Sequence, residues 1–352
     1  MKKKRILILG RVNDRNLGDA IIVDTCAYAL RNIAKQNYKK ISLTALNIYS
    51  EDTDNIRRVV KDYDAIVFPG GGVNSRQFVN TAKTILKGNT TTKLFFNANG
   101  ISTGNIPKVK KGLMDIMNNE LTVQVTTRGD FETAKEYVTT EKKYPVAHIL
   151  DPAIFSKDTY GVSKDEKSDV VGVGLIRSEI FEENGKDFEK DAVFAMYVQL
   201  LDELDKRGIK WELFCNGTKA DYNFAKFVLE ETGRPVTLLA PRPKESIALV
   251  KLVAKYKGII AARFHANIIA TSLEVPSVAL VWNDKMLGFA DLIGCRERYV
   301  NDLDKLRDAK ALVDILEKAM AEGYDKDRID REKKRTLKVM SHIIGRCYRF
   351  KV

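Results

Sequence analysis

One short stretch decides the fold of this chain: residues 258–270 read GIIAARFHANIIA. The run from Gly258 to Ala262 is typical of a buried parallel strand, and the apolar residues after it recur at helical spacing. Arg263 and His265 stand where this strand gives way to the helix. Parallel α/β sheets bind ligands at such junctions, because the following helix offers N–H groups without partners. The stretch therefore predicts an anion site, with a core histidine beside a surface arginine as the alternative.

The same alternation of short apolar runs and longer amphipathic stretches extends over the chain and predicts parallel sheets with crossover helices. We expect strands at 5–9, 41–46, 65–69, 93–97, 121–126, 146–150, 170–176, 210–215, 236–239, 258–262 and 278–281. We expect helices at 20–35, 191–207, 221–231, 244–255, 266–273 and 285–293. The predicted fold is α/β, with two Rossmann-like doubly wound domains facing a cleft; one large sheet is the alternative.

The length of 352 residues favours two domains, because single cores rarely exceed about 300 residues. Residues 156–168 are polar and charged and are predicted to be a linker. We therefore expect an N-terminal domain at 1–155, a C-terminal domain at 169–325 and a basic helical tail at 326–352. The favoured interpretation of the tail is a helix docked on the body, and the alternative is a basic amphipathic anchor on a bilayer.

The net charge of +12 suits an anionic substrate, an anionic membrane surface or nucleic acid. Nucleic acid is disfavoured, because the basic residues are scattered and no nucleic-acid motif stands out. The four cysteines contain no CxxC pair, which argues against a zinc ribbon or a disulfide framework and suits a reducing cytoplasm. No metal site is expected, because the histidines are dispersed. The first apolar run is too short for a signal peptide, so we expect a soluble or peripheral protein.

The segment GRVNDRNLGD at residues 10–19 joins the first strand to the first helix. It is neither the dinucleotide fingerprint nor a P-loop. Gly18 allows backbone to approach a ligand closely. Asp19 is expected to cap a helix that begins at Ala20, and a ligand-facing carboxylate is the alternative.

Polar residues and glycines also follow other predicted strands. Gly70, Gly71 and Gly72 predict a nest of N–H groups around an oxyanion, or else a plain turn. Arg128 can bind a carboxylate or phosphate through two parallel hydrogen bonds, although a lone arginine here is more often on the surface. Asp151, before a proline, is expected to end the first domain. From the fold we infer that four residues converge on the cleft: Arg128, Arg263, His265 and Lys285.

Taken in order, these pieces resemble the polysaccharide pyruvyl transferase family, which transfers a pyruvyl group from phosphoenolpyruvate to a sugar as a ketal. The resemblance covers residues 5–295. It is carried by Asn16-x-Gly18-Asp19 with Ala20-Ile21, the glycine run 70–72, Arg128 with Asp130, and Ala262-Arg263-Phe264-His265 leading to Val275-Pro276-Ser277 and Lys285. Trp282-Asn283-Asp284 departs from the tyrosine-like position usual in the family, which puts acceptor contacts in doubt.

The resemblance implies a fold like the two-domain GT-B glycosyltransferases, with the acceptor on the N-terminal side and phosphoenolpyruvate on the C-terminal side. It implies that phosphoenolpyruvate, the donor substrate, binds to Arg128, Arg263, His265 and Lys285. No further cofactor is expected. We assign proton transfer to His265 and give Asp19 the role of base for an acceptor hydroxyl. The other candidate substrate-binding residues are Asn16, Gly18, Gly70, Gly71, Gly72 and Asn99.

Acceptors in this family are usually sugars on a polyprenyl diphosphate carrier. The resemblance therefore implies a cytoplasmic enzyme, peripheral at the inner face of the plasma membrane, where the basic tail would meet anionic lipid. Two other functions stay open: a GT-B nucleotide-sugar glycosyltransferase, and a non-catalytic protein that binds a glycolipid or another polyanion.

Overall fold

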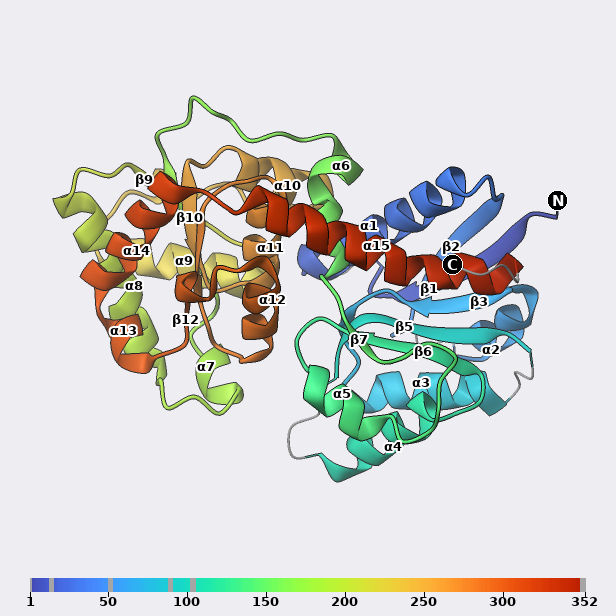
Figure 1. The fold of residues 1–352 in the computed structure, drawn as a ribbon. Coiled ribbons are helices and arrows are strands. Elements are labelled where there is room, and N and C mark those ends of the chain that lie inside the picture. The colour runs from blue at the N-terminus through green and yellow to red at the C-terminus, as the bar shows by residue number, and fades with distance from the viewer. Residues whose placement is uncertain (1, 13–15, 50–52, 88–90, 102–105, 349–352) are drawn as a thin grey trace. The chain divides into compact units, whose positions relative to one another are not determined.

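The computed structural model describes residues 2–12, 16–49, 53–87, 91–101 and 106–348, which form two α/β units (Figure 1). Within these ranges, unit 1 comprises residues 2–12, 19–152 and 330–348. Unit 2 comprises residues 16–18 and 153–329. Most of the C-terminal helix, which was predicted as a basic helical tail at 326–352, therefore belongs to unit 1.

The described residues of unit 1 form a parallel sheet in the order β2-β1-β3-β5-β6-β7, with β4 paired to β5. Its strands are β1 Lys4–Gly10, β2 Ile41–Asn47, β3 Ala65–Phe68, β4 Gly71–Gly72, β5 Lys93–Gly100, β6 Thr122–Thr127 and β7 Ala147–His148. Strand β1 lies between β2 and β3, so the strand order reverses between β1 and β3. Open α/β sheets bind ligands beyond the carboxyl ends of the strands at such a switch point.

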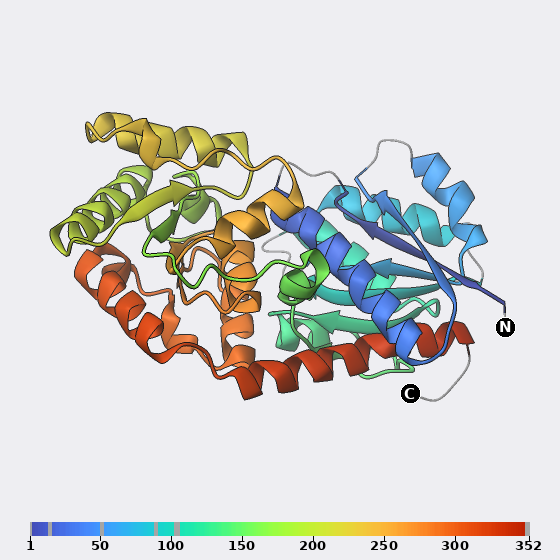
Figure 2. The same cartoon turned by 90° about the horizontal axis from the view of Figure 1, so that it is seen from above.

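Helices cover both faces of this sheet. They are α1 Leu17–Gln36, α2 Thr53–Val59, α3 Arg76–Lys87, α4 Pro107–Met117, α5 Phe131–Tyr137 and the C-terminal α15 Lys326–Tyr348, with a 3₁₀ turn at Val60–Asp62. Figures 1 and 2 show α1 and α15 on one face, with α3 and α4 on the other. Burial on both faces explains why β1 and β3 read as continuous apolar runs rather than alternating ones.

The core of unit 1 beneath α3 and α4 is built around three aromatic rings. Phe68 lies 5.0 Å from Phe78 and 4.9 Å from Phe96, measured between ring centroids. All three side chains are buried. Phe68 is the last residue of β3, so this cluster fixes the end of the strand from which the glycine run departs.

Unit 2 holds a second parallel sheet, in the order β12-β11-β10-β8-β9. Its strands are β8 Val171–Gly174, β9 Trp211–Phe214, β10 Gly258–Ala261, β11 Ser277–Leu280 and β12 Tyr299–Val300. Its helices are α6 Ser156–Tyr160, α7 Ile180–Glu183, α8 Lys190–Lys206, α9 Lys219–Glu231, α10 Ser246–Ala254, α11 Phe264–Ser272, α12 Lys285–Ile293, α13 Leu303–Arg307 and α14 Ala309–Glu322, with 3₁₀ turns at Pro152–Phe155, Val236–Leu238 and Arg296–Arg298. The strand order reverses between β8 and β10.

Every predicted strand except 236–239 overlaps an observed strand, although 146–150 is a strand only at Ala147–His148. The segment 236–239 is a 3₁₀ turn at Val236–Leu238, and its backbone meets the sheet only at a bridge between Leu213 and Leu239. Pro235 stands just before it, lacks an N–H donor and disfavours ladder pairing. The predicted linker 156–168 is also partly wrong, because it begins with helix α6, which ends at Gly161 in the left-handed region (φ 62°).

Helix α15 is docked on unit 1 by its apolar side, as the favoured interpretation of the tail predicted. Met340, Ile343 and Ile344 are buried. The ring of His342 stacks on Tyr144 with 4.0 Å between centroids. Residues 349–352 of the predicted tail lie outside the described residues. None of the helices in the described part of the chain combines the length and apolar character that a membrane span needs.

Candidate functional site

The predicted strand-to-helix junction is present in unit 2. Strand β10 ends at Ala261, and α11 begins at Phe264, with Arg263 as the residue that precedes its first turn. The side chain of Arg263 makes no cap hydrogen bond to this helix end. His265 lies in the first turn and is buried. A guanidinium beside the N-terminus of a nine-residue helix has the geometry of an anion site.

Arg263 is held by a buried carboxylate that the sequence reasoning missed. Its Nε donates to Asp221 Oδ2 at 2.7 Å and its Nη2 to Asp221 Oδ1 at 2.8 Å. Asp221 also accepts from the backbone N–H of Arg177 at 3.0 Å. It thus links the loops after β8 and β10, the two strands at the switch point. The pairing fixes the guanidinium plane, and Nη1 takes no part in it.

A sequence signal for Asp221 exists, although it is weak. Asp221 stands in the first turn of α9, three residues after Thr218, whose side chain accepts from the Asp221 backbone N–H at 3.2 Å. Such spacing marks a helix start but does not say which arginine the carboxylate binds.

Lys285 lies at the first position of α12, as predicted, in the loop after the neighbouring strand β11. Its Nζ is 4.7 Å from the centroid of the Trp282 ring. Trp282 Nε1 donates to the carbonyl of Ala262 at 2.8 Å. The tryptophan therefore ties the Lys285 loop to the residue preceding Arg263, so three of the predicted cations follow two adjacent strands of one sheet.

Residues 16–18 pack against His265 within unit 2. A Cβ added to Gly18 would lie 2.3 Å from His265 Nδ1, so only glycine permits this approach. The Leu17 N–H donates to the Asn216 carbonyl at 3.2 Å. The Asn216 side chain is buried, and neither its oxygen nor its nitrogen has a hydrogen-bond partner among the described residues. These contacts give Asn16-x-Gly18 a physical role beside the histidine; residues 13–15 lie outside the described residues.

Arg128 follows β6 and belongs to unit 1, whereas Arg263, His265 and Lys285 belong to unit 2. Its Nη1 donates to Asp151 Oδ2, and both side chains are buried. Asp151, expected only to end the domain, is thus the charge partner of Arg128. The predicted convergence of all four residues on one cleft stays a prediction.

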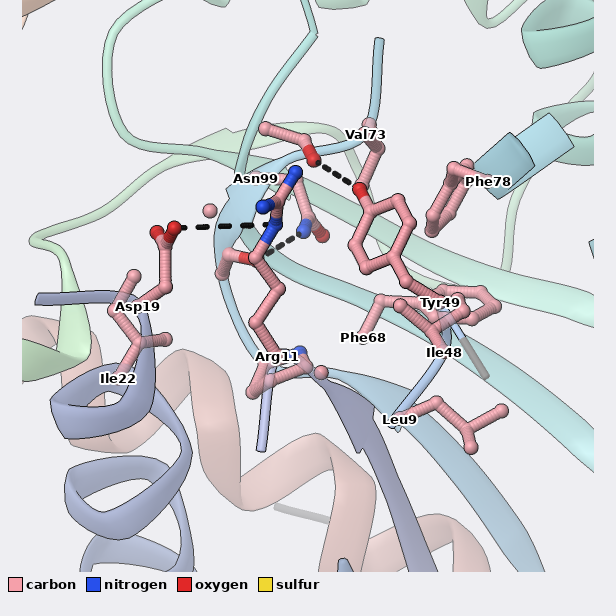
Figure 3. Close-up of a pocket in the computed structure, with 15 residues that line it drawn as sticks. Leu9, Arg11, Asp19, Ile22, Ile48, Tyr49, Phe68, Val73, Phe78 and Asn99 are labelled. Carbon is pink, nitrogen blue, oxygen red and sulfur yellow. Dashed lines mark hydrogen bonds and ion pairs between the residues drawn. The ribbon is translucent and has the colours of Figure 1, made fainter. Parts of the chain in front are cut away.

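Unit 1 contains a pocket at its own switch point (Figure 3). The pocket brings together five of the predicted site residues: Asp19, Gly70, Gly71, Gly72 and Asn99. Arg11 and Tyr49, which the sequence reasoning did not single out, also line it. The structure thus places these predicted residues around the carboxyl ends of β1, β3 and β5, with Gly71 and Gly72 in β4.

Asp19 does not cap the first helix, so the favoured interpretation was wrong. Helix α1 begins at Leu17, two residues before Asp19, and the aspartate lies inside the first turn. Its Oδ2 lies 3.8 Å from Arg11 Nε at the pocket wall. Asp19 lines the pocket, and its role as a ligand-facing carboxylate stays a prediction.

The glycine run forms strand β4 instead of a turn or an isolated nest. Gly70 and Gly71 have φ of 143° and 76°, which L-residues with side chains rarely adopt. The Gly70 carbonyl accepts from Asn99 Nδ2 at 3.1 Å, and the Gly72 carbonyl accepts from the Tyr49 hydroxyl at 3.2 Å. The run therefore forms a pocket wall made of backbone.

The described residues contain no group of three or more histidine, cysteine or acidic side chains arranged to hold a metal ion. The cysteines Cys26, Cys215, Cys295 and Cys347 are buried and unpaired as thiols. Burial raises the pKa of Cys215 to about 11 and of Cys295 to about 12, so neither is a ready nucleophile. The chemistry at hand is that of fixed cations, one histidine and carboxylates.

Solved structures share this fold at low sequence identity. UDP-GlcNAc 2-epimerase from Methanocaldococcus jannaschii is 13% identical, with a TM-score of 0.60 over 97% of this chain and 100% of the other. Staphylococcus aureus MnaA, solved with UDP, is 12% identical, with a TM-score of 0.59 over 98% of each chain. An α,α-trehalose-phosphate synthase from Burkholderia vietnamiensis is 10% identical, with a TM-score of 0.54 over 99% of this chain and 98% of the other. These similarities show the GT-B-like fold and no more.

Among proteins with curated annotation, none shows significant sequence similarity to this chain. The family profile described as polysaccharide pyruvyl transferase matches residues 16–284, a span that runs from the Asn16-x-Gly18 segment to the residue before Lys285. The chain belongs to the polysaccharide pyruvyl transferase family.

Proposed function

We propose that this protein transfers the pyruvyl group of phosphoenolpyruvate to two hydroxyls of a sugar, forming a ketal and releasing phosphate. The sugar would belong to a cell-surface polysaccharide or its lipid-linked precursor. One observation carries the proposal: Arg263, oriented by buried Asp221, stands beside His265 at the N-terminus of helix α11. Phosphoenolpyruvate carries a carboxylate and a phosphate, and fixed cations are what such a ligand needs.

His265 donates a proton to the methylene carbon of phosphoenolpyruvate, which leaves an oxocarbenium-like centre at the carbon bearing the carboxylate. A sugar hydroxyl adds to that carbon and gives up its proton. The carbon–oxygen bond to phosphate then breaks, and the second hydroxyl adds to the same carbon and gives up its proton, which completes the ketal. Arg263 and Arg128 hold the donor's anionic groups, and Lys285 stabilises the phosphate as it leaves. Proton transfer of this kind contributes roughly 10²–10⁴-fold to a rate.

Asp19 is the base proposed for an acceptor hydroxyl, because its carboxylate lines the unit 1 pocket. If the acceptor is carried on a polyprenyl diphosphate, the enzyme works at the cytoplasmic face of a membrane. The buried apolar side of α15 excludes insertion of that helix while it is docked. The exposed residues Arg331, Lys334 and Lys338 lie along one side of the helix and would attract anionic lipid instead.

A thermal-shift titration with phosphoenolpyruvate tests the donor. A ligand that binds only the folded protein stabilises it by about 2.7 kcal/mol at a hundredfold excess over its Kd. We expect stabilisation by phosphoenolpyruvate beyond that by inorganic phosphate, and its loss in Arg263→Ala. Arg296→Ala is the matched control, because Arg296 is a surface arginine of the same unit whose ion pair with Asp291 is 3.5 Å long.

The other ligands in that titration separate the rival functions. Stabilisation by UDP alone would replace the proposal with a nucleotide-sugar glycosyltransferase. An equal response to phosphoenolpyruvate and phosphate would fit a protein that binds anions without this chemistry. Release of phosphate from phosphoenolpyruvate when a sugar acceptor is added would establish turnover.

A further inference from the structure

The side chain of Arg11 covers the unit 1 pocket. Its guanidinium carbon lies 4.2 Å from the centroid of the Tyr49 ring, and its Nε lies 3.8 Å from Asp19 Oδ2. Figure 3 shows the guanidinium between the carboxylate of Asp19 and the ring of Tyr49. The Arg11 side chain is 43% exposed. An ion pair and a cation–π contact this exposed to water are individually weak.

The pocket also contains a buried acceptor that lacks a donor. Asn99 is fully buried, and its Nδ2 donates to the Gly70 carbonyl. This bond fixes the amide orientation and leaves Oδ1 without a partner among the described residues. A buried amide oxygen without a hydrogen bond is costly, and a ligand that brings a donor recovers that cost.

The lining selects the chemistry of the ligand. The Asp19 carboxylate and Asn99 Oδ1 both accept hydrogen bonds, so the ligand has to bring donors such as hydroxyls. Tyr49 offers an aromatic face once Arg11 moves, and such faces pack against the C–H face of a sugar ring. With Arg11 in place the pocket encloses only about 20 Å³, room for about one water molecule, and the rest of its empty space is open to solvent. A sugar ring can therefore enter only if Arg11 moves away from Tyr49.

We propose that this pocket binds one neutral pyranose ring, stacked on Tyr49 with its hydroxyls on Asp19 and Asn99, and that Arg11 covers Tyr49 until the sugar displaces it. Calling this ring the acceptor rests on the proposed function. The binding site itself does not, because it involves neither phosphoenolpyruvate nor a residue of unit 2. The ligand class is a hydroxyl-rich uncharged ring, in contrast to the anion expected beside Arg263.

Saturation-transfer NMR on the full chain, without phosphoenolpyruvate, tests the proposal. The probes are the methyl pyranosides of glucose, galactose, mannose, N-acetylglucosamine and N-acetylmannosamine at tens of millimolar, with uridine as an aromatic comparator. We expect saturation of at least one glycoside and its loss in Tyr49→Ala. Tyr49→Phe keeps the ring and should retain binding, which distinguishes loss of the stacking face from loss of the hydroxyl bond to Gly72.

Arg11→Ala should bind the same glycoside several-fold more tightly, because it removes the group that competes for Tyr49. Arg5→Ala is the matched control: Arg5 stacks on Tyr63 at 4.9 Å, and neither residue lines this pocket. The control should leave the affinity unchanged. If Tyr49→Ala does not fold, the pair Arg11→Ala and Tyr49→Phe carries the test.

Absence of saturation for every glycoside would overturn the proposal, and so would equal binding by a folded Tyr49→Ala protein. Uridine that displaces the glycosides or binds alone would assign the pocket to a nucleobase instead. A glycoside signal without any thermal shift by phosphoenolpyruvate would support this sugar site and contradict the assignment of phosphoenolpyruvate as the donor. A thermal shift by phosphoenolpyruvate without any glycoside signal would contradict the sugar site alone.

Discussion

Asp221 holds Arg263 through two hydrogen bonds, of 2.7 Å from Nε and 2.8 Å from Nη2, and its carboxylate is completely buried. The other candidate arginine has a similar partner, because Arg128 donates to buried Asp151. In each unit, a buried aspartate therefore fixes an arginine proposed to bind the donor. A cation held in place before the ligand arrives avoids the entropy cost of ordering a long side chain during binding.

Asp221→Asn keeps the shape of the side chain and removes its charge. Breaking a buried ion pair from one side costs about 3–5 kcal/mol, and the partial exposure of Arg263 favours the lower end. We expect a lower urea midpoint and, in the protein that remains folded, at least a ~10-fold weaker affinity for phosphoenolpyruvate, about 1.4 kcal/mol. Asp202→Asn is the control, because Asp202 is 62% exposed in its pair with Arg234. Wild-type affinity in a folded Asp221→Asn protein would show that Arg263 needs no positioning.

Gly18→Ala tests the contact between the N-terminal segment and His265. The added methyl would lie 2.3 Å from His265 Nδ1 and 2.5 Å from Cγ, so either the ring or the segment has to move. We expect phosphate release to fall by at least ~10-fold, because proton transfer depends on ring position. Gly100→Ala is the control, since its nearest atom would lie at 3.7 Å without positive φ. Turnover in Gly18→Ala equal to that of the control would separate this contact from catalysis.

Local patterns predicted much of this molecule. The strand-to-helix junction at Arg263 and His265 and the start of α12 at Lys285 follow from periodicity and apolar runs within a few residues. The partners of the arginines could not be predicted in this way, because Asp221 is 42 residues from Arg263 and Asp151 is 23 residues from Arg128.

The same limit explains the errors elsewhere. Asp19 was assigned to a cap because its spacing fitted one, yet α1 starts two residues earlier, at Leu17. Tyr49 lines the pocket, and its hydroxyl donates to the carbonyl of Gly72, which is 23 residues away in the sequence. Only the order of the strands in the sheet brings these two residues together. The sequence pattern predicts which strand a residue follows. Which other side chain contacts that residue depends on tertiary packing.

Asp151→Ala leaves the buried Arg128 guanidinium without its charge partner. We expect the free energy of unfolding, measured by urea denaturation, to decrease by about 3–5 kcal/mol. The double variant Arg128→Met with Asp151→Leu should recover most of that loss, because apolar residues of similar volume replace a buried pair at little cost. Recovered stability without recovered turnover would identify Arg128 as a residue of the reaction. Recovery of both would assign the pair to the fold alone.

The exposed basic residues of α15 should govern any membrane contact. Each Lys or Arg near an anionic surface contributes about 1 kcal/mol, so the triple variant Arg331→Glu, Lys334→Glu, Lys338→Glu should release the protein from phosphatidylserine vesicles in a sedimentation assay. High salt should do the same to the wild type. The control variant reverses the charge of three exposed lysines on other helices, by changing each to glutamate. These lysines are Lys206, Lys310 and Lys318. Equal loss in both variants would mean that net charge, and not this helix, drives binding.

His342 should make the docking of α15 dependent on pH. Burial lowers the pKa of His342 below its usual value, and the charges of Lys338 and Lys143 lower it further. Gln124 Nε2 lies 3.1 Å from His342 Nδ1, where an unprotonated ring nitrogen accepts a hydrogen bond. As pH falls through about 6.5, the unfolded chain takes up the proton before the folded protein does, so the free energy of unfolding decreases. The loss levels off below the folded pKa.

His342→Phe keeps a ring against Tyr144 and cannot titrate. We expect its Tm to fall less than that of the wild type between about pH 7.5 and pH 5. The difference between the two proteins isolates this histidine, because the other titrating groups are common to both. The comparison is made by thermal unfolding at constant ionic strength, since salt screens the lysine charges. Parallel curves of Tm against pH would mean that His342 binds its proton equally in the folded and unfolded chains. The neutral ring would then make no contribution to the stability of the docked helix.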